Sequence, residues 1–451
     1  MKSAIHVAIT TVFWVVLAVT CFAQSDEKPD IEFHAPFRTS VADSPQEFQD
    51  KYLLGDWMGL RSKLAHRGVR FALLSITDPF GNATGGQRRG ASDYNLVAVG
   101  VLLDTGYIAG WHGGTFHVGF ADNFGTRLSE KYVGNGFPVQ LADVADAHPR
   151  LTYLSYTQEM FEEKVSIRVG RLTINSVSHE EFLGSEYFKA FTSVGIDLVP
   201  LGLFFNAPGA FGYPDTTWGT RIKFQPSSRF YTMAGAYNGD PNLKNGTHHG
   251  LDFSIRGPLF LIGEAGWRRN YPKDRSSFSA DLKFGGYYNG GRSMTFGSGI
   301  GGRPSQTRRG RYGLYVLGDQ VLSRWGDPGQ NRHLGVFGAF TFAPDQRVNK
   351  MPYFFDTGLV AYGPLRSRPR DFAGFAVVYG SYSRDLRRME EIQSSSSAGV
   401  QKFEMALEWN YGLAIRPGLL LQPDIQWLVR PNGIQTIPNA LAVGANIVVN
   451  W

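Results

Sequence analysis

The C-terminal segment 402–451 alternates between apolar and polar positions with a period of two. Because successive side chains of a β-strand point to opposite faces, the alternation from Lys402 to Ile415 predicts a strand with one apolar and one polar face. The pattern returns after residues 416–418 and again after residues 430–438, and the chain ends on the aromatic Trp451. Long amphipathic strands, joined alternately by a tight turn and a loop, are typical of a transmembrane β-barrel.

The same periodicity dominates the chain from Arg70 onward. In segments 165–170 and 217–224, the positions between the apolar residues include arginine and lysine. A charged side chain is costly in lipid but well solvated in a wet lumen. We therefore expect the polar faces of the strands to line an aqueous lumen.

Seventeen segments have strand-like periodicity, but barrels of this class have an even number of strands and both chain ends in the periplasm. Counts made backwards from Trp451 and forwards from Arg70 agree only if residues 251–255 are not an independent strand. That segment then belongs to an extracellular loop, or it extends strand 259–267 through a kink at Gly257-Pro258. The sequence thus predicts an all-β fold, a 16-stranded antiparallel transmembrane β-barrel.

The count also places the connections. The expected extracellular loops are 81–93, 125–149, 172–215, one that starts at Gly239, 290–310, 344–353, 385–401 and 430–438. The expected periplasmic turns are 106–113, 161–163, 226–228, 269–276, 324–332, 364–371 and 416–418.

The longest loop, 172–215, falls between strands 5 and 6. A loop of this length needs a reason, and a sixteen-stranded barrel encloses an open aqueous channel unless something narrows it. We predict that this loop folds inward and sets the pore size; the alternative is a loop packed on its neighbours at the rim. It carries His179, Glu180, Glu181, Glu186, Tyr187 and Lys189, and then the apolar stretch 199–210.

The start of the chain is that of an exported protein. Residues 1–23 predict a secretory signal peptide, with Lys2, an apolar stretch 4–19 and a small-x-small site at 21–23; a signal anchor is the alternative. Residues 24–50 are polar and predict a flexible leader. In 51–68, apolar residues at 53, 57, 60 and 64 form one helical stripe that ends at Gly68, which predicts a short N-terminal periplasmic helix before the barrel domain 69–451.

Composition agrees with this class. The chain has 54 glycines and 14% aromatics, which a barrel uses in turns and interface girdles, although a soluble all-β sandwich or propeller could share them. The only cysteine, Cys21, leaves with the signal peptide, so the mature chain can form no disulfide and no thiolate metal site. No run of about 18 apolar residues follows residue 23, so no transmembrane helix is expected. An exported chain with many strands and no helical span indicates the bacterial outer membrane.

Short motifs follow one another along the chain in the order of a known family. They include Leu54-Gly55-Asp56-Trp57-x-Gly59-Leu60-Arg61, Gly110-Trp111-His112-Gly113-Gly114, Tyr237-Asn238-Gly239-Asp240-Pro241, Ile262-Gly263-Glu264-Ala265-Gly266 and Leu421-Gln422-Pro423-Asp424. This ordered set, collinear from about residue 53 to the end, resembles the OprB-type carbohydrate-selective porins. Met58 and Trp451 depart from the glycine and phenylalanine usual in that family. The resemblance implies a sixteen-stranded outer-membrane channel for monosaccharides, with glucose as the best-known substrate.

A sugar channel needs polar groups that replace water and aromatic faces for the C–H surface of the sugar, with binding weak enough for release. Arg171 lies in register with Val169, so it must turn inward through the loop or face the rim. For each candidate the alternative is a solvated lumen or rim charge, and an arginine-rich lumen would also favour anions. A general or anion-preferring porin without a sugar site is therefore the alternative. The candidate substrate-binding residues, on lumen-facing strand positions or on the 172–215 loop, are Arg168, Arg171, Arg221, Glu186, Tyr187, Asp122 and Arg127.

Signals for catalysis are weak. Gly297-x-Gly299-x-x-Gly302 fits a dinucleotide fingerprint only formally, because it lies in a predicted loop with no following helix. The pair His248-His249 has no supporting ligand pattern, and neither His-Glu-x-x-His nor Gly-x-Ser-x-Gly occurs. We expect no enzyme activity, cofactor or metal; a barrel enzyme is a third hypothesis.

Basic residues in predicted loops and the aromatic residue at the end of the chain predict partners other than small sugars. Basic residues at 88–89 and 308–311, in predicted extracellular loops, suit contact with anionic lipopolysaccharide rather than nucleic acid. The terminal aromatic predicts recognition by the barrel-assembly machinery during insertion. A monomer and a homo-oligomer are both compatible with the sequence.

Overall fold

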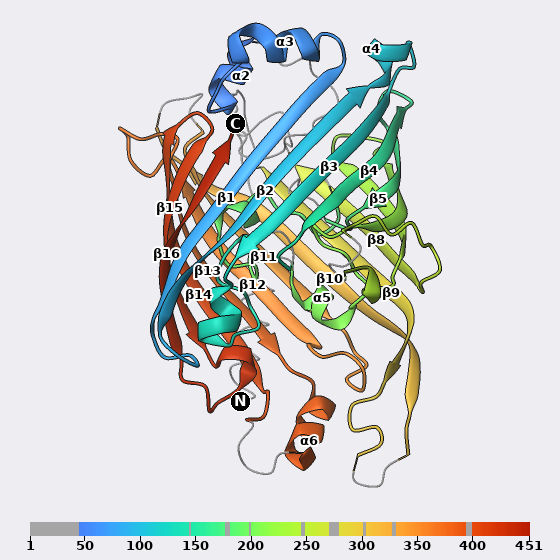
Figure 1. The fold of residues 1–451 in the computed structure, drawn as a ribbon, viewed down its shortest axis with the longest axis vertical. Helices are drawn as coiled ribbons and strands as arrows, with labels where there is room; N and C mark the ends of the chain where they lie inside the picture. The colour runs from blue at the N-terminus through green and yellow to red at the C-terminus, as the bar shows by residue number, and fades with distance from the viewer. Residues whose placement is uncertain are drawn as a thin grey trace.

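The computed structural model describes residues 45–143, 146–175, 181–197, 200–244, 249–269, 279–300, 304–326, 331–393 and 399–451 (Figure 1). Its strands form one closed antiparallel barrel in which each strand pairs with its sequence neighbours and β1 pairs with β16. The strands are β1 Val69–Thr84, β2 Gly90–Asp104, β3 Gly114–Gly125, β4 Pro149–Met160, β5 Val165–Leu172, β6 Thr217–Phe224, β7 Phe230–Asn238, β8 Leu259–Arg269, β9 Ala280–Met294, β10 Thr307–Arg324, β11 His333–Phe342, β12 Tyr353–Tyr362, β13 Phe372–Ser381, β14 Phe403–Arg416, β15 Leu419–Val429 and β16 Ala440–Asn450. The longer helices are α2 Pro45–Lys51, α3 Leu60–Ala65, α4 Thr105–Ala109, α5 Gly202–Asn206 and α6 Arg384–Gln393.

The predicted sixteen-stranded barrel is confirmed. Residues 251–255 form no strand, so the strand count was right to exclude them. The 290–310 loop is shorter than predicted, because β9 runs on to Met294 and β10 begins at Thr307. In Figure 1, helices α3 and α4 lie at the end of the barrel that carries the C-terminus, and α6 lies at the opposite end.

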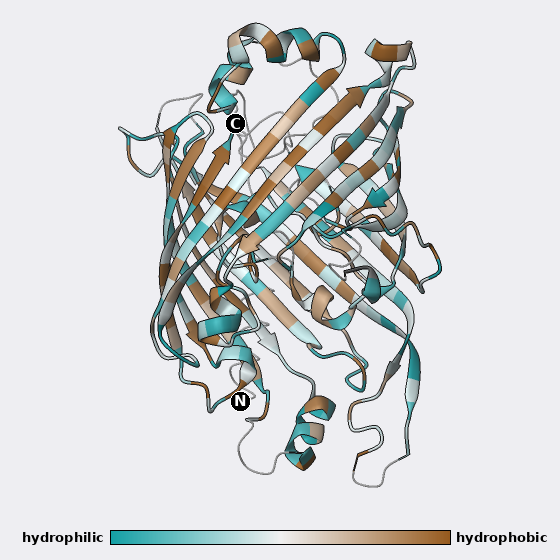
Figure 2. Ribbon diagram, viewed as in Figure 1, coloured by the Kyte–Doolittle hydropathy of each residue, from teal (hydrophilic) through white to brown (hydrophobic). Residues whose placement is uncertain are grey.

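The barrel wall has the two faces that the alternation predicted. On β14, Glu404 and Glu408 are fully buried inside, whereas the neighbouring Trp409 is 44% exposed on the outside. Figure 2 shows apolar residues alternating with more polar ones along the strands. None of the helices in the described ranges is long and apolar enough to cross a membrane.

The N-terminal segment differs in detail from the single helix that was predicted. Helix α2 occupies the last part of the segment predicted as a flexible leader, because Phe48 is buried there and its ring packs on Tyr52. Trp57 and Met58 have positive φ angles of 51° and 57°, which interrupt the helical stripe before α3 begins. The predicted signal peptide and the remaining leader lie outside the described residues.

This N-terminal segment stabilises the junction at which the first strand, β1, pairs with the last strand, β16. The guanidinium of Arg61 lies 3.8 Å from the ring centroid of Tyr52 and 4.1 Å from that of Trp57, and it donates a hydrogen bond to a main-chain oxygen of Trp451. Trp451 in turn bonds β1 through its backbone amide and through its indole Nε1, which lies 2.8 Å from Ser75 Oγ. The chain end is therefore fastened to both the first strand and the segment before it.

The loop between β5 and β6 lies inside the barrel, as predicted, rather than at the rim. The amide of Leu183 donates to Glu264 on β8 (2.9 Å), and the amide of Thr192 donates to Glu408 on β14 (2.7 Å). Lys283 on β9 donates to the carbonyl oxygen of Gly184 (2.6 Å). The loop thus crosses the lumen and is bonded to the wall at several strands.

The loop between β3 and β4 also folds inward, which the sequence analysis did not predict. The amide of Ala142 donates to Asp78 on β1 (2.7 Å), and that of Gly136 donates to Glu404 on β14 (2.8 Å). Several inward carboxylates expected in an aqueous lumen are therefore buried and accept hydrogen bonds from loop amides instead of water.

Candidate functional site

Two predicted residues, Arg168 on β5 and Arg221 on β6, pair directly and face the lumen. Glu181 of the inward loop lies between them, and its Oε1 accepts from both guanidinium groups at 2.8 Å. Arg168 also donates to Thr157 (2.9 Å) and Arg221 donates to Ser166 (2.8 Å). The side chain of Arg168 keeps 26% of its surface exposed, against 5% for Arg221 and 8% for Glu181. Arg168 is therefore the member of this cluster that can still reach a solute.

Three aromatic rings lie along the same part of the wall. His117 on β3 stacks on Tyr153 on β4, with ring centroids 4.3 Å apart, and Tyr153 faces Tyr213 from the inward loop at 6.0 Å. Gly119 leaves room for this stack, since a Cβ there would lie 3.1 Å from the ring of Tyr153. The strand register places His117 one inward row from Arg168, toward the extracellular side. Aromatic faces and a partly exposed guanidinium are thus brought together.

Charges in this cluster nearly cancel. Burial acts to raise the pKa of Glu181, but Arg221 and Arg168 outweigh it, so the pKa of this carboxyl lies below its usual value. Glu159 on β4 adds a second carboxylate, which accepts from Ser166 Oγ at 2.7 Å. With Lys223 included, the cluster contains three cations and two carboxylates, Glu181 and Glu159. The arginines therefore do not create the strongly anion-attracting lumen that their number alone would indicate.

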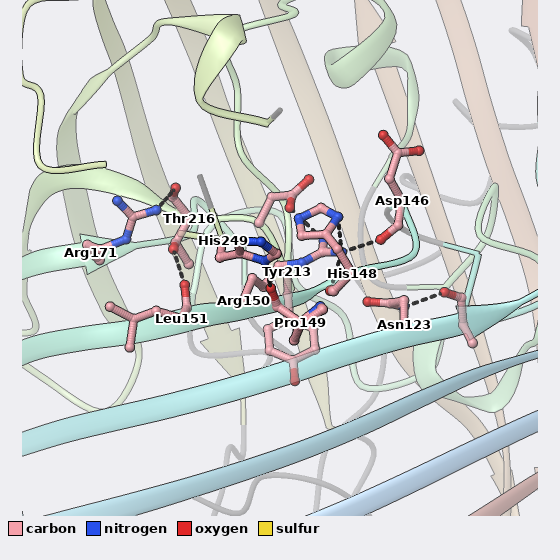
Figure 3. A network of polar contacts seen from close by, with 12 residues as sticks. Asn123, Asp146, His148, Pro149, Arg150, Leu151, Arg171, Tyr213, Thr216 and His249 are labelled. Atoms are coloured by element: carbon pink, nitrogen blue, oxygen red, sulfur yellow. Dashed lines mark hydrogen bonds and ion pairs between the residues drawn. The ribbon is translucent and has the colours of Figure 1, made fainter. Parts of the chain in front are cut away.

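Arg171 is placed differently from Arg168. It is in the outward register of β5 and is only 2% exposed. At the extracellular ends of the strands, its guanidinium donates to the carbonyl oxygen of Thr216 (2.8 Å), as Figure 3 shows. It also donates to the carbonyl oxygen of Asp252 (2.7 Å). Of the two alternatives in the sequence analysis, the rim is correct, because strand alternation turns this side chain away from the lumen.

Glu186 and Tyr187 lie on the inward loop but contact other strands. Glu186 forms an ion pair with Lys189 (3.1 Å), and its amide donates to Asp319 on β10. Tyr187 is 4% exposed, and its hydroxyl lies 3.3 Å from Nε2 of His333 on β11. The structure therefore does not join these two residues to the Arg168–Glu181–Arg221 cluster.

Asp122 and Arg127 are also away from that cluster. Asp122 lies on β3 in register with Phe120 and Phe124, which are 50% and 46% exposed on the outer face. The expectation of a lumen-facing position for Asp122 was wrong, because strand alternation places it outside. Arg127 belongs to the β3–β4 loop, where it forms ion pairs with Asp143 (3.7 Å) and Asp146 (3.1 Å).

The sequence analysis missed the aromatic part of this cluster. His117 and Tyr153 occupy inward positions of their strands, so a search of the polar faces for rings would have found them. Tyr213 carried no such signal, because it reaches the wall only through the path of the loop. Glu181 was recognised as a polar residue of that loop, but nothing in the sequence joined it to the arginines.

The structure describes only part of the metal and dinucleotide candidates from the sequence. In the part of the chain that the structure describes, no group of three or more His, Cys, Asp or Glu could hold a metal ion. His179, Glu180, His248 and Gly302 lie outside the described residues.

A closed sixteen-stranded barrel with an apolar outer face and a polar interior narrowed by inward loops defines a porin. Residues 88–450 match the sequence model of the carbohydrate-selective porins of the OprB family, and the chain belongs to that family. It is a channel of the bacterial outer membrane, and its family and fold are those of a channel rather than an enzyme.

Similar proteins agree with this assignment over nearly the whole chain. Porin B of Pseudomonas aeruginosa is 24% identical over 440 residues, which cover 90% of this chain and 93% of that protein. The putative porin QuiX of Acinetobacter baylyi is 23% identical over 438 residues, which cover 89% and 94%. A high-pH structure of Pseudomonas putida OprB shares the fold, with a TM-score of 0.81, 23% identity and coverage of 89% of this chain and 99% of that one.

Proposed function

We propose that this channel passes neutral monosaccharides of the glucose type by passive diffusion, and that the solute is received between Arg168 and the stacked rings of His117, Tyr153 and Tyr213. The observation that carries this proposal is the partly exposed guanidinium of Arg168, held by Glu181 beside aromatic faces. Arg168 offers N–H donors to sugar hydroxyls, and the outer rings of the stack, His117 and Tyr213, offer apolar faces to the C–H surface, while the buried Tyr153 supports them. Such contacts replace water without binding so tightly that release is blocked.

The charge balance separates this proposal from its main alternative. An anion-preferring porin would need an excess of uncompensated cations at the constriction. Glu181 bridges Arg168 and Arg221 at 2.8 Å, which cancels part of their field. A nearly neutral, hydrogen-bonding surface favours neutral polyols over anions.

Single-channel conductance in planar bilayers with increasing glucose tests the proposal. Millimolar glucose should reduce the ion current, and Arg168→Ala should weaken this block by roughly tenfold, the effect of about 1.4 kcal/mol of lost hydrogen bonding. Arg127→Ala is the matched control, because that arginine lies in the β3–β4 loop. An ion current that millimolar sugar does not reduce would rule out a sugar site and leave a general diffusion porin.

We further propose that the chain has no catalytic activity and that its first 23 residues are a signal peptide removed on export. Hydrolysis of lipid substrates that is lost on replacing one serine or histidine would contradict the first statement. An N-terminus of the purified outer-membrane protein that begins before residue 24 would contradict the second.

Two partners belong to this proposal. Exposed Arg308 and Arg309 lie at the extracellular end of β10, where they suit the phosphates of lipopolysaccharide. The terminal Trp451 serves as a recognition residue for the barrel-assembly machinery. A lipopolysaccharide affinity that is unchanged in the double variant Arg308→Ala/Arg309→Ala would remove the first partner.

A further inference from the structure

Strands β5 and β6 are the shortest strands of the barrel. Each of these strands has eight residues, whereas β9 and β10 have 15 and 18. A transmembrane strand needs about 9–11 residues to cross the hydrocarbon core. At the extracellular ends of β5 and β6, the surrounding lipid must therefore contact a segment that is not part of a β-strand.

Residues 249–256, in the loop between β7 and β8, lie across the outer face at this place. The ring of Phe253 contacts that of Trp218, with centroids 5.6 Å apart, and Trp218 is in the outward register of β6. The carbonyl oxygen of Asp252 accepts from Arg171, which is in the outward register of β5. His249 lies over the start of β4, and its carbonyl oxygen accepts from the amide of Leu151 at 2.9 Å (Figure 3).

The apolar side chains of this segment are largely exposed. Leu251, Phe253 and Ile255 are 57%, 58% and 74% exposed, and they alternate with the less exposed Asp252 and Ser254. Single exposed apolar residues are ordinary on a protein surface, but a contiguous apolar group marks an interaction site. This group continues the outer apolar face of the barrel through Trp218.

Side chains of the wall satisfy the backbone of the segment. Arg171 donates to the carbonyl oxygen of Asp252 (2.7 Å), and Asn238 donates to that of Ser254 (2.9 Å). The side chain of Asp252 accepts from the amide of Ser254 (2.7 Å). Irregular backbone in contact with lipid must find such partners, because no water is available to replace them. An aqueous loop would not need two buried wall side chains for this purpose.

We propose that residues 251–255 form a lipid-facing flap that completes the apolar outer surface above the short strands β5 and β6. Its occupant is the acyl-chain region of the outer leaflet, which Leu251, Phe253 and Ile255 contact. Arg171 and Asn238 fasten the flap to the wall. Arg171 is thus an attachment residue on the outer face and takes no part in sugar binding.

Nitroxide labelling tests this placement. The background variant is Cys21→Ser, which leaves no native cysteine. One variant carries the label at Phe253→Cys. Two reference variants carry it at Ile222→Cys, on the outer face, and at Ile392→Cys, on α6. The full channel is reconstituted in liposomes, and collision with oxygen is compared with collision with a water-soluble nickel chelate. The label at position 253 should prefer oxygen as strongly as the label at 222, and several-fold more than the label at 392. A chelate preference equal to that at 392 would overturn the proposal.

A second measurement distinguishes lipid from another copy of the chain. Dipolar broadening between labels at position 253 of two copies would show that a neighbouring channel occupies the surface, and would overturn the choice of acyl chains. Absence of broadening together with oxygen preference supports it.

The attachment is tested separately from the placement. Arg171→Ala should increase the mobility of the label at 253 and leave glucose block of the ion current unchanged, while Arg256→Ala, a change of an exposed arginine beside the flap, should alter neither. Heat-modifiable migration of each variant confirms that the barrel is folded. Loss of glucose block with an unchanged label would assign Arg171 to the sugar path instead of the flap.

Discussion

Glu408 on β14 offers the sharpest test of how the inward loop is held. Its carboxylate accepts from the amides of Thr192 (2.7 Å) and Ser193 (3.0 Å), and it is fully buried. Replacing it by alanine leaves both amides without their acceptor inside the barrel. We therefore predict that Glu408→Ala releases this part of the loop while the barrel itself stays closed.

The size of the effect follows from the two hydrogen bonds. A hydrogen bond to a carboxylate contributes about 1.5–3 kcal/mol, so losing two weakens docking by roughly 3–6 kcal/mol. Because about 1.4 kcal/mol corresponds to a tenfold change in an equilibrium, the released state should become at least about a hundredfold more populated. Other bonds still hold the loop, including that of Leu183 to Glu264, so the release is confined to the region of Thr192.

Single-channel recording in planar bilayers measures this release. Glu408→Ala should show a larger mean conductance and more open-channel noise than the parent. Asp356→Ala is the matched control, because Asp356 on β12 is equally buried and its carboxylate accepts no hydrogen bond from a described loop residue. Conductance and noise equal to the parent in Glu408→Ala would refute the view that wall carboxylates hold the constriction.

Three further outcomes are expected. Glu181→Gln should shift the reversal potential in a KCl gradient toward chloride, since Arg168 and Arg221 lose their counter-charge. The pKa of Glu181 lies below the ordinary 4.5, so its charge and the stability it contributes are present above that pH and are lost only as the pH falls through the lower value. The difference in selectivity between the parent and Glu181→Gln should therefore be the same at about pH 8 and at about pH 5, and a difference that disappears within that window would contradict the assignment. Deleting Trp451 should lower the amount of channel in the outer membrane without changing the conductance of inserted copies, and normal levels would count against a role in assembly. Arg61→Ala should reduce the free energy of unfolding in urea by roughly 2–4 kcal/mol, mainly through the loss of its cation–π contacts with Tyr52 and Trp57 and of its hydrogen bond to Trp451. An unchanged unfolding midpoint would show that the junction between β1 and β16 does not depend on it.

Much of the site lay beyond the reach of sequence reasoning. Arg168 and Arg221 could be placed in the lumen because each occupies the polar side of its own strand. The side of the wall on which Asp122 lies could not be predicted in this way. A single polar residue, considered without its strand neighbours, does not show whether its position faces outward or inward. Glu408 was recognised as inward, but its partner Thr192 lies 216 residues away in the chain. No local pattern records such a pairing.

There is a physical reason why the sequence determines some features of this protein and only the tertiary structure determines others. Period-two alternation is local, and lipid on one side and a polar interior on the other impose it on every strand, so the sequence alone determined the strand count, the closed barrel and the turns. The interior imposes no comparable periodicity on the loops. Only the tertiary structure decided that the β3–β4 loop also enters the lumen, that buried carboxylates hold both inward loops, and that Arg168 remains partly exposed beside aromatic rings while Arg171 faces the rim. These outcomes depend on hydrogen bonds between distant segments, whose geometry exists only after the barrel has closed.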